Sequence, residues 1–166
     1  MLTTGAVLSI TVIVCVKLLL VLYLVDRLKP GCRDKLVLVG NPANRRVTGF
    51  RAAAARHGTP VAVLPWRRLA AGAVTLPENA LVRVDSPGED AEVDRLLRGA
   101  ARPAAHGEIV GMAAWYGGLC AALSRLADAA RAAGAWLLND PADIATMFDK
   151  PACQARLSAA GVPVPA

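Results

Sequence analysis

Short apolar runs alternate with helix-forming segments over most of this 166-residue chain. The apolar runs are Leu36–Gly40, Val61–Leu64, Ala80–Val84 and Ala135–Leu138. The helix-forming segments that follow or separate them are residues 44–57, 66–72, 89–99 and 115–133. Continuous apolar runs of this length are typical of strands covered on both faces by helices. The pattern therefore predicts an α/β, Rossmann-like domain over residues 35–140, with three layers and a mostly parallel sheet.

A hydrophobic segment precedes this domain. From Gly5 to Val25 the chain is apolar with a single charge at Lys17, and a helix of about 20 apolar residues spans a bilayer core. Basic residues follow the segment at Arg27, Lys29, Arg33 and Lys35. Residues 1–34 are thus predicted to form a transmembrane helix and a basic linker, anchoring a cytoplasmic domain to the inner or plasma membrane with the C-terminus inside. A wrongly chosen upstream start codon is the alternative origin of this segment.

The formal net charge is +6, and the basic residues are unevenly placed. No acidic residue occurs between Asp34 and Glu78, whereas that stretch contains Lys35, Arg45, Arg46, Arg51, Arg56, Arg67 and Arg68. The stretch either presents a solvated arginine face or creates a positive field that attracts a small anionic or carboxylate substrate. No set of aromatic residues accompanies the arginines, so binding to nucleic acid is not expected.

The cysteines and histidines show none of the spacings typical of metal sites or disulfide frameworks. The sequence has no CxxC pair and no Cys/His combination with zinc-ligand spacing. His106 and Glu108 lie too close together on one predicted loop to form an acid/base pair, and no Ser/His/Asp set can be assembled. We therefore predict no metal site and no catalytic residue in this chain.

The loop after the first apolar run is the candidate substrate site. It reads Asn41-Pro42-Ala43-Asn44, and Arg45 follows at the start of a predicted helix. Ligands of parallel sheets bind at the carboxyl ends of strands, and helix N-termini favour anions. Asn41, Asn44 and Arg45 are thus predicted to contact a substrate carboxylate or phosphate; a plain capping turn with solvated arginines is the alternative. The loop lacks the GxGxxG fingerprint, so a nicotinamide-dependent enzyme is not supported.

An aromatic pair opens the predicted helix at 115–133. Trp115 and Tyr116 are followed directly by Gly117 and Gly118. The glycines would allow close backbone approach, so the two rings could line a pocket; equally, they could anchor the core.

The last part of the chain carries the pattern N-x-P-x2-I-x4-D-K-x6-L-x3-G-V-P-x-P, from Asn139 to Pro165. Asn139 follows the fourth predicted strand, where Pro141 is expected to turn the chain away from the sheet. A helix is expected to begin at Asp149 or Lys150, because a proline at the next position is tolerated in a first turn. Leu157 is expected to pack inward and Gly161 to end this helix.

This pattern resembles the junction of ATP-grasp ligases, where a Rossmann-like N-terminal domain is joined to the ATP-binding domains. D-alanine–D-alanine ligases, biotin carboxylases and the glutamate ligases that modify ribosomal proteins are similar at this point. The resemblance implies that residues 35–140 are the pre-ATP-grasp domain and that residues 141–166 start the junction, with a helix and a Pro-x-Pro exit. It also implies that Lys150 contacts nucleotide phosphates.

The resemblance further implies an enzyme that joins a carboxylate to an amine or similar nucleophile, using ATP and Mg²⁺. The family's adenine pocket, glycine-rich loop and Mg²⁺-binding carboxylates come after this junction. The expectation is therefore a substrate-side domain that ends before the ATP-binding domains, is inactive alone and binds no cofactor tightly. It should expose an apolar docking face and so could form a homodimer. A membrane-anchored, non-enzymatic Rossmann-like binding or regulatory module is the alternative.

Overall fold

The computed structural model describes residues 35–88 and 90–164. The hydrophobic helix and basic linker predicted for residues 1–34 lie outside the described residues. Within the two described ranges, no helix is both long and apolar enough to cross a bilayer.

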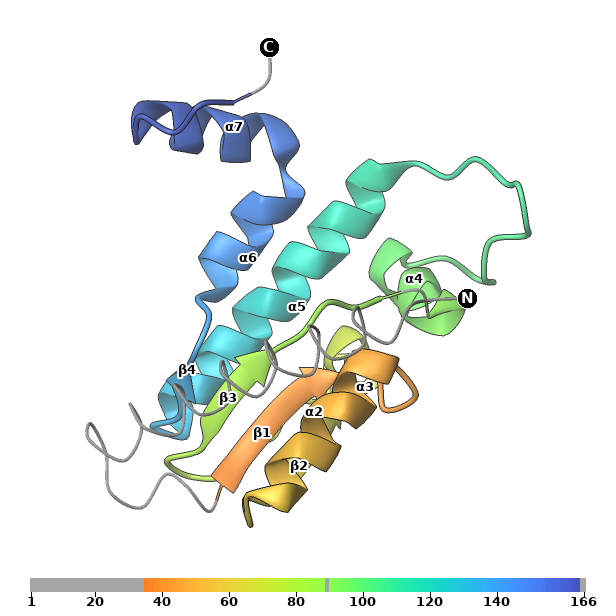
Figure 1. Ribbon diagram of the computed structural model, residues 1–166. Helices are drawn as coiled ribbons and strands as arrows, with labels where there is room; N and C mark the ends of the chain where they lie inside the picture. The colour runs from red at the N-terminus through yellow and green to blue at the C-terminus, as the bar shows by residue number, and fades with distance from the viewer. Residues whose placement is uncertain (1–34, 89, 165–166) are drawn as a thin grey trace, which may run out of the picture.

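A four-stranded sheet forms the centre of the fold (Figure 1). Its strands are β1 (Leu36–Gly40), β2 (Val61–Pro65), β3 (Leu81–Val84) and β4 (Trp136–Leu137). They lie in the order β2-β1-β3-β4, and each neighbouring pair is parallel. The α/β class and the positions of the predicted strands are confirmed. The order and direction of the strands are consistent with a Rossmann-like arrangement.

The described residues form six helices, and the sequence predicts all of them but one. They are α2 (Arg45–Arg56), α3 (Trp66–Ala70), α4 (Ala91–Arg98), α5 (Met112–Ala132), α6 (Pro141–Phe148) and α7 (Lys150–Ala159). The unpredicted helix is α6. Pro141 occupies its first turn, where a missing N–H costs no hydrogen bond, and the Asp140 carboxylate caps it by accepting from Ala142 N at 2.7 Å. Pro141 therefore begins a helix, α6, through which the chain leaves the sheet.

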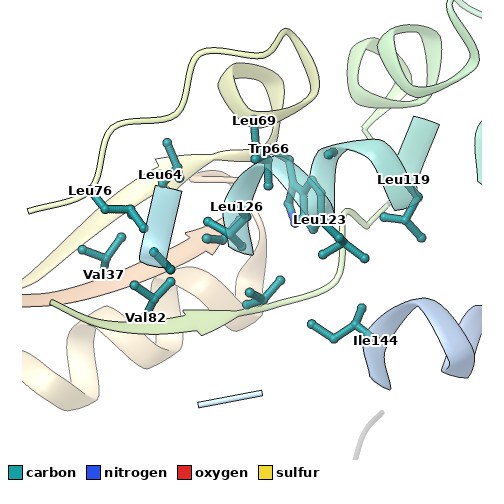
Figure 2. Close-up of a cluster of buried hydrophobic side chains, with 14 of the residues drawn as sticks. Val37, Leu64, Trp66, Leu69, Leu76, Val82, Leu119, Leu123, Leu126 and Ile144 are labelled. Atoms are coloured by element: carbon teal, nitrogen blue, oxygen red, sulfur yellow. The ribbon is translucent and has the colours of Figure 1, made fainter. Parts of the chain in front are cut away.

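Alternate side chains of the strands enter two separate cores, because neighbouring residues of a strand point to opposite faces of the sheet. Leu36 and Leu38 of β1 pack with α2 on one face. Val37 and Val39 pack on the other face with residues of α3, α4, α5 and α6. Figure 2 shows Trp66, Leu123 and Leu126 gathered in this larger core. The result is the predicted three-layer fold, with its two helical layers of unequal size.

Helix α5 approaches the end of α4 closely at Gly118. A Cβ atom on Gly118 would lie 1.9 Å from the carbonyl oxygen of Leu97. No side chain fits in that space, so a glycine is required for this contact. Gly117, by contrast, has open space where a Cβ would be.

The side chain of Asn139 extends the short strand β4. Its Nδ2 donates to the carbonyl oxygen of Val84 at 2.8 Å, and its Oδ1 accepts from Val84 N at 2.9 Å. The amide thus takes the place of a backbone peptide group beside β3. Asn139 lies at the carboxyl edge of the sheet, as predicted.

Helix α7 lies outside the core. It begins at Lys150 and ends before Gly161, which has a φ of 75°, so both predicted bounds are confirmed. None of its residues is buried, and Leu157 is 40% exposed. The prediction that Leu157 packs inward is therefore wrong. The physical reason is that α7 packs mainly against α6, beyond the reach of the two sheet cores.

Besides Leu157 and Val162, on and after α7, large apolar side chains are exposed in two further regions of the described residues. Ile109, Met112, Met147 and Phe148 lie before or within the first turn of α5 and at the end of α6. Trp136 and Leu138 lie on or beside β4. An exposed apolar surface was expected from the sequence, and the homodimer inferred from it stays a prediction.

Candidate functional site

A pocket of about 520 Å³ lies at the carboxyl ends of β1, β2 and β3. Its lining residues are Asn41, Ala43, Asn44, Arg67, Asp90, Ala91, Glu92 and Pro103. Helix α2 leaves β1 for one face of the sheet, whereas α4 leaves β3 for the other. In parallel sheets, ligands bind where adjacent strands send their chains to opposite faces. We call this space the switch-point pocket.

Two asparagines of the β1 loop lie in its wall. Asn44 caps α2: its Oδ1 accepts from Arg46 N at 2.8 Å, and its backbone N–H donates to the Asn41 carbonyl at 2.9 Å. Asn41 ties this loop to the one after β3, because its Nδ2 donates to the carbonyl oxygen of Pro87. Gly88 follows with a φ of 69°, and a Cβ there would lie 3.2 Å from Asn44 Nδ2. The two loops are therefore held close together.

Asn41 has one polar atom without a partner. The residue is 7% exposed, and its Oδ1 is buried with no hydrogen bond among the described residues. Because a carbonyl oxygen can only accept, Nδ2 must be the atom that faces Pro87, and the position of Oδ1 follows. A buried acceptor left unsatisfied costs about 1–3 kcal/mol. Asn41 lines the pocket, but this oxygen atom itself is buried.

An ion pair between Arg67 and Asp90 also lines the pocket. The Arg67 guanidinium donates to both carboxylate oxygens of Asp90, over distances of 3.1–3.3 Å. Asp90 also caps α4, accepting from the backbone N–H groups of Glu92 and Val93 at 3.0 and 3.1 Å. Burial by itself would raise the pKa of Asp90, but the hydrogen bonds from Arg67 and from the helix amides outweigh it and lower that pKa.

Glu92 adds a second carboxylate. It is paired with Arg95 one turn further along α4, with N–O distances of 2.7 and 2.9 Å. The hydrogen bond from Arg95 lowers the pKa of Glu92. Both carboxylates in the pocket are therefore ionised at neutral pH.

The predicted substrate residues are only partly brought together. Asn41 and Asn44 line the switch-point pocket, whereas Arg45 is exposed and does not line it. Its neighbour Arg46 lies 3.7 Å from the Asp85 carboxylate. The loop is thus a capping turn followed by exposed arginines and, at the same time, a pocket wall.

Lys150 lines a different pocket, of about 390 Å³, between the start of α5 and the start of α7. Its other lining residues are Met112, Ala113, Trp115, Tyr116, Phe148, Asp149 and Pro151. The rings of Trp115 and Phe148 lie 5.5 Å apart, and Trp115 also packs against the larger core. Both interpretations of Trp115 from the sequence therefore hold in part. We call this space the aromatic pocket.

Tyr116 is tied to the neighbouring helices of the aromatic pocket. Its hydroxyl donates to the carbonyl oxygen of Ala145 at 3.3 Å, which links α5 to α6. A hydrogen bond with Cys120, then burial and the nearby Asp149 carboxylate, raise the pKa of Tyr116. The hydroxyl is therefore neutral at physiological pH.

The aromatic pocket offers one cation to a phosphate. Lys150 Nζ donates to the carbonyl oxygen of Met147 at 3.2 Å and remains exposed. The start of α7 offers few free backbone donors to a phosphate, because the Asp149 carboxylate already accepts from Ala152 N and Pro151 has no N–H to donate. The start of α5 has neither a side-chain cap nor an acidic residue in its first turn. Lys150 and the first amides of α5 are the groups here that fit a phosphate.

The described residues do not fit a magnesium site. Among residues 35–88 and 90–164, no three side chains of His, Cys, Asp or Glu are grouped so that they could hold a metal ion. The carboxylates in the switch-point pocket are bound by arginines instead.

Sequence reasoning noted Arg67 only as one member of the basic stretch, and it missed Asp90, Glu92 and Pro103. Arg67 lies in α3, which directly follows β2, and Asp90 caps α4, the helix after β3. The rule that found Asn41 would have found both residues had it been applied to each strand. Pro103 comes from the long connection before α5, and no local pattern marks it. No family model, no curated protein and no solved structure matches the chain.

Proposed function

We propose that residues 36–164 form the N-terminal, substrate-side domain of an ATP-grasp-type ligase. Such an enzyme joins a carboxylate to an amine or similar nucleophile, with ATP supplying the activation. The observation that carries the proposal is the position of Lys150. Lys150 is the first residue of α7, which follows α6 after the chain has left the sheet. It also lines the aromatic pocket.

The roles of two other motif residues support the same proposal. The side-chain amide of Asn139 pairs with β3, and Pro141 starts α6. These two residues fix the point where the chain leaves the sheet and enters the successive helices α6 and α7. A connection of this kind, from the sheet into helices outside the core, suits a domain that is followed by a nucleotide-binding domain. The Mg²⁺-binding carboxylates of the proposed enzyme would have to lie outside the described residues.

Nucleotide binding to the protein isolated from its own cells tests the proposal. We expect a fluorescent ATP analogue to bind only weakly to this domain, because the family's adenine pocket comes after the junction. Lys150→Ala should weaken this binding by about tenfold or more, because a hydrogen bond to a charged group is worth about 1.5–3 kcal/mol. Arg156→Ala is the matched control. It removes a cation from the same helix, where Arg156 pairs with Asp143 at 2.6 Å and does not line the pocket.

Equal effects of the two substitutions would contradict the role of Lys150. Absence of nucleotide binding by the native protein would contradict the ligase itself. In that case the membrane-anchored, non-enzymatic binding module becomes the better explanation. Peptide mapping of the isolated protein, together with membrane fractionation, would then show whether residues 1–34 are present and whether they retain the protein in the membrane.

A further inference from the structure

We propose that the outer face of α2 binds the surface of a membrane that contains anionic phospholipids. We call the surface formed by Arg45, Arg51 and Arg56 the basic face of α2. The proposal goes beyond the ligase and does not depend on it. It concerns a contact between the folded domain and lipid headgroups, in addition to the anchor predicted for residues 5–25.

One side of α2 packs on the sheet and the other side is open to an outside partner. Arg45 and Arg56 are exposed and lie eleven residues apart. This is about three helical turns, so the two side chains start from the same side of the helix, roughly 16 Å from each other. The other exposed residues of α2 besides its arginines are small: Thr48, Gly49, Ala52 and Ala55. No bulky side chain therefore keeps the helix away from a flat surface.

The charge of the molecule is divided unevenly between its two halves. Residues 35–88 contain eight basic and two acidic side chains, whereas residues 89–166 contain seven basic and nine acidic ones. Helix α2 itself carries four arginines and no acidic residue. The positive charge of the described domain is thus concentrated in the half that contains α2, which creates a local field that attracts polyanions.

The arginines of the second half are neutralised within the chain, and those of the basic face are not. Five arginines after α3 each pair with a carboxylate: Arg95, Arg98, Arg102, Arg131 and Arg156. On α2, Arg46 lies 3.7 Å from the Asp85 carboxylate. Arg45, Arg51 and Arg56 form no ion pair with any residue that the structure describes. These three guanidinium groups are therefore available to an anionic partner outside the chain.

The position of α2 relative to the start of the domain favours a membrane as this partner. Arg56 ends α2, and five residues later Val61 pairs with Leu36 at the start of β1. Figure 1 shows the end of α2 and the start of β1 at the same edge of the sheet. Nine residues separate the apolar segment Gly5–Val25 from Lys35, and they span at most about 32 Å. An anchor in that segment would keep the basic face near the headgroups, which attract basic residues within about a Debye length.

A nucleic acid is the other polyanion that an arginine-rich helix could bind. Proteins that bind single strands add aromatic rings on which bases stack. The one aromatic residue of α2, Phe50, is 5% exposed, and its ring lies 4.9 Å from the Arg83 guanidinium. The basic face offers charge without a ring for a base, which suits a lipid surface better.

Chemical modification of arginines in the full chain tests the proposal. The chain is reconstituted into vesicles of phosphatidylcholine, with or without phosphatidylglycerol, and treated with phenylglyoxal; mass spectrometry then gives the rate at each arginine. We expect phosphatidylglycerol to slow modification of Arg45, Arg51 and Arg56 about threefold or more. Arg131 and Arg156, which are exposed but paired, should react at the same rate in both vesicles. The protection should disappear in 1 M salt, where the Debye length falls to about 3 Å.

Two double substitutions provide a matched pair. Arg45→Gln with Arg56→Gln removes two charges of the basic face and should return the modification rate of Arg51 nearly to its value in phosphatidylcholine. Arg131→Gln with Arg156→Gln removes the same charge from α5 and α7 and should leave the protection of Arg51 unchanged. All four positions are exposed, so neither variant disturbs the core.

Three results would overturn the proposal. The first is equal modification of the basic face in the two kinds of vesicle. The second is an equal effect of the two double substitutions, which would show that only the net charge matters. The third is protection of the basic face by a DNA duplex, added to the phosphatidylcholine vesicles, that matches protection by phosphatidylglycerol; this would indicate a nucleic-acid interface. None of them bears on Lys150, so the ligase proposal is tested separately by nucleotide binding.

Discussion

Asp90 is the residue that joins α3 to α4. Its carboxylate accepts from Arg67 on one side and from two backbone amides of α4 on the other, and its side chain is 20% exposed. The net result of burial and these hydrogen bonds is a pKa below the ordinary value of 3.8. A carboxyl with a lowered pKa stabilises the folded state above its unfolded pKa, and this contribution is lost as the pH falls through the folded pKa.

Replacing Asp90 by Asn should therefore change stability in a pH-dependent way. Asparagine keeps the capping oxygen but loses the charge opposite Arg67, so we expect a loss of about 0.5–1 kcal/mol at pH 7. The difference from the wild type should shrink as the pH is lowered well below 3.8, where the wild-type carboxyl also becomes neutral. Urea unfolding at neutral and acidic pH measures this. A difference that is the same at both would show that the Arg67 pair does not stabilise the fold.

Single residues also show how far the sequence defines the candidate site. Asn41 and Asn44 could be predicted because they directly follow a recognisable apolar run. The partnership of Arg67 with Asp90 could not, because it joins α3 to the start of α4, two elements that the order of the strands in the sheet brings together. The free Oδ1 of Asn41 could not be predicted either, since it depends on the position of a carbonyl in another loop.

The contact between α4 and α5 depends on one glycine. Gly118→Ala would place a Cβ 1.9 Å from the Leu97 carbonyl oxygen, so the two helices would have to separate. We expect this substitution to lower the free energy of unfolding by about 1–3 kcal/mol or more. Gly117→Ala is the control on the same helix: it meets open space, and alanine favours a helix by about 0.5–1 kcal/mol. Denaturant unfolding compares the two, and a neutral Gly118→Ala would contradict the close contact.

At the level of elements, the strands follow from their apolar composition, and most helices follow from their caps and periodicity. Helix α6 escapes prediction because a proline can either end a segment or occupy a first turn. The local sequence around Pro141 is compatible with both. The prediction that Leu157 packs inward is wrong for a different reason. A leucine in a helix packs inward only if another element lies there, and the sequence of α7 does not say what lies beside it.

Stability is unevenly distributed over the described part of the molecule. Leu123 lies in the larger core, whereas α7 has no buried residue. We expect the amides of α7 to exchange with solvent through local opening, while those of the middle of α5 exchange only with global unfolding. Leu157→Ala should change the free energy of global unfolding by less than about 0.5 kcal/mol, and Leu123→Ala should lower it by about 2–5 kcal/mol. Hydrogen exchange and urea unfolding measure both. Protection of α7 equal to that of α5 would mean that α7 is part of the same cooperative unit.

The pairing of β4 with β3 has a consequence for the order in which the chain folds. The two strands share only the pairs Leu81–Trp136 and Val82–Leu137, besides the Asn139 amide, and all of α4 and α5 lie between them. Closing so long a loop for so few hydrogen bonds is entropically unfavourable early in folding. β1 pairs with β2 across a much shorter stretch, which contains α2. We therefore infer that β4 joins the sheet after the rate-limiting step, so that weakening Asn139 would speed unfolding and leave the folding rate nearly unchanged.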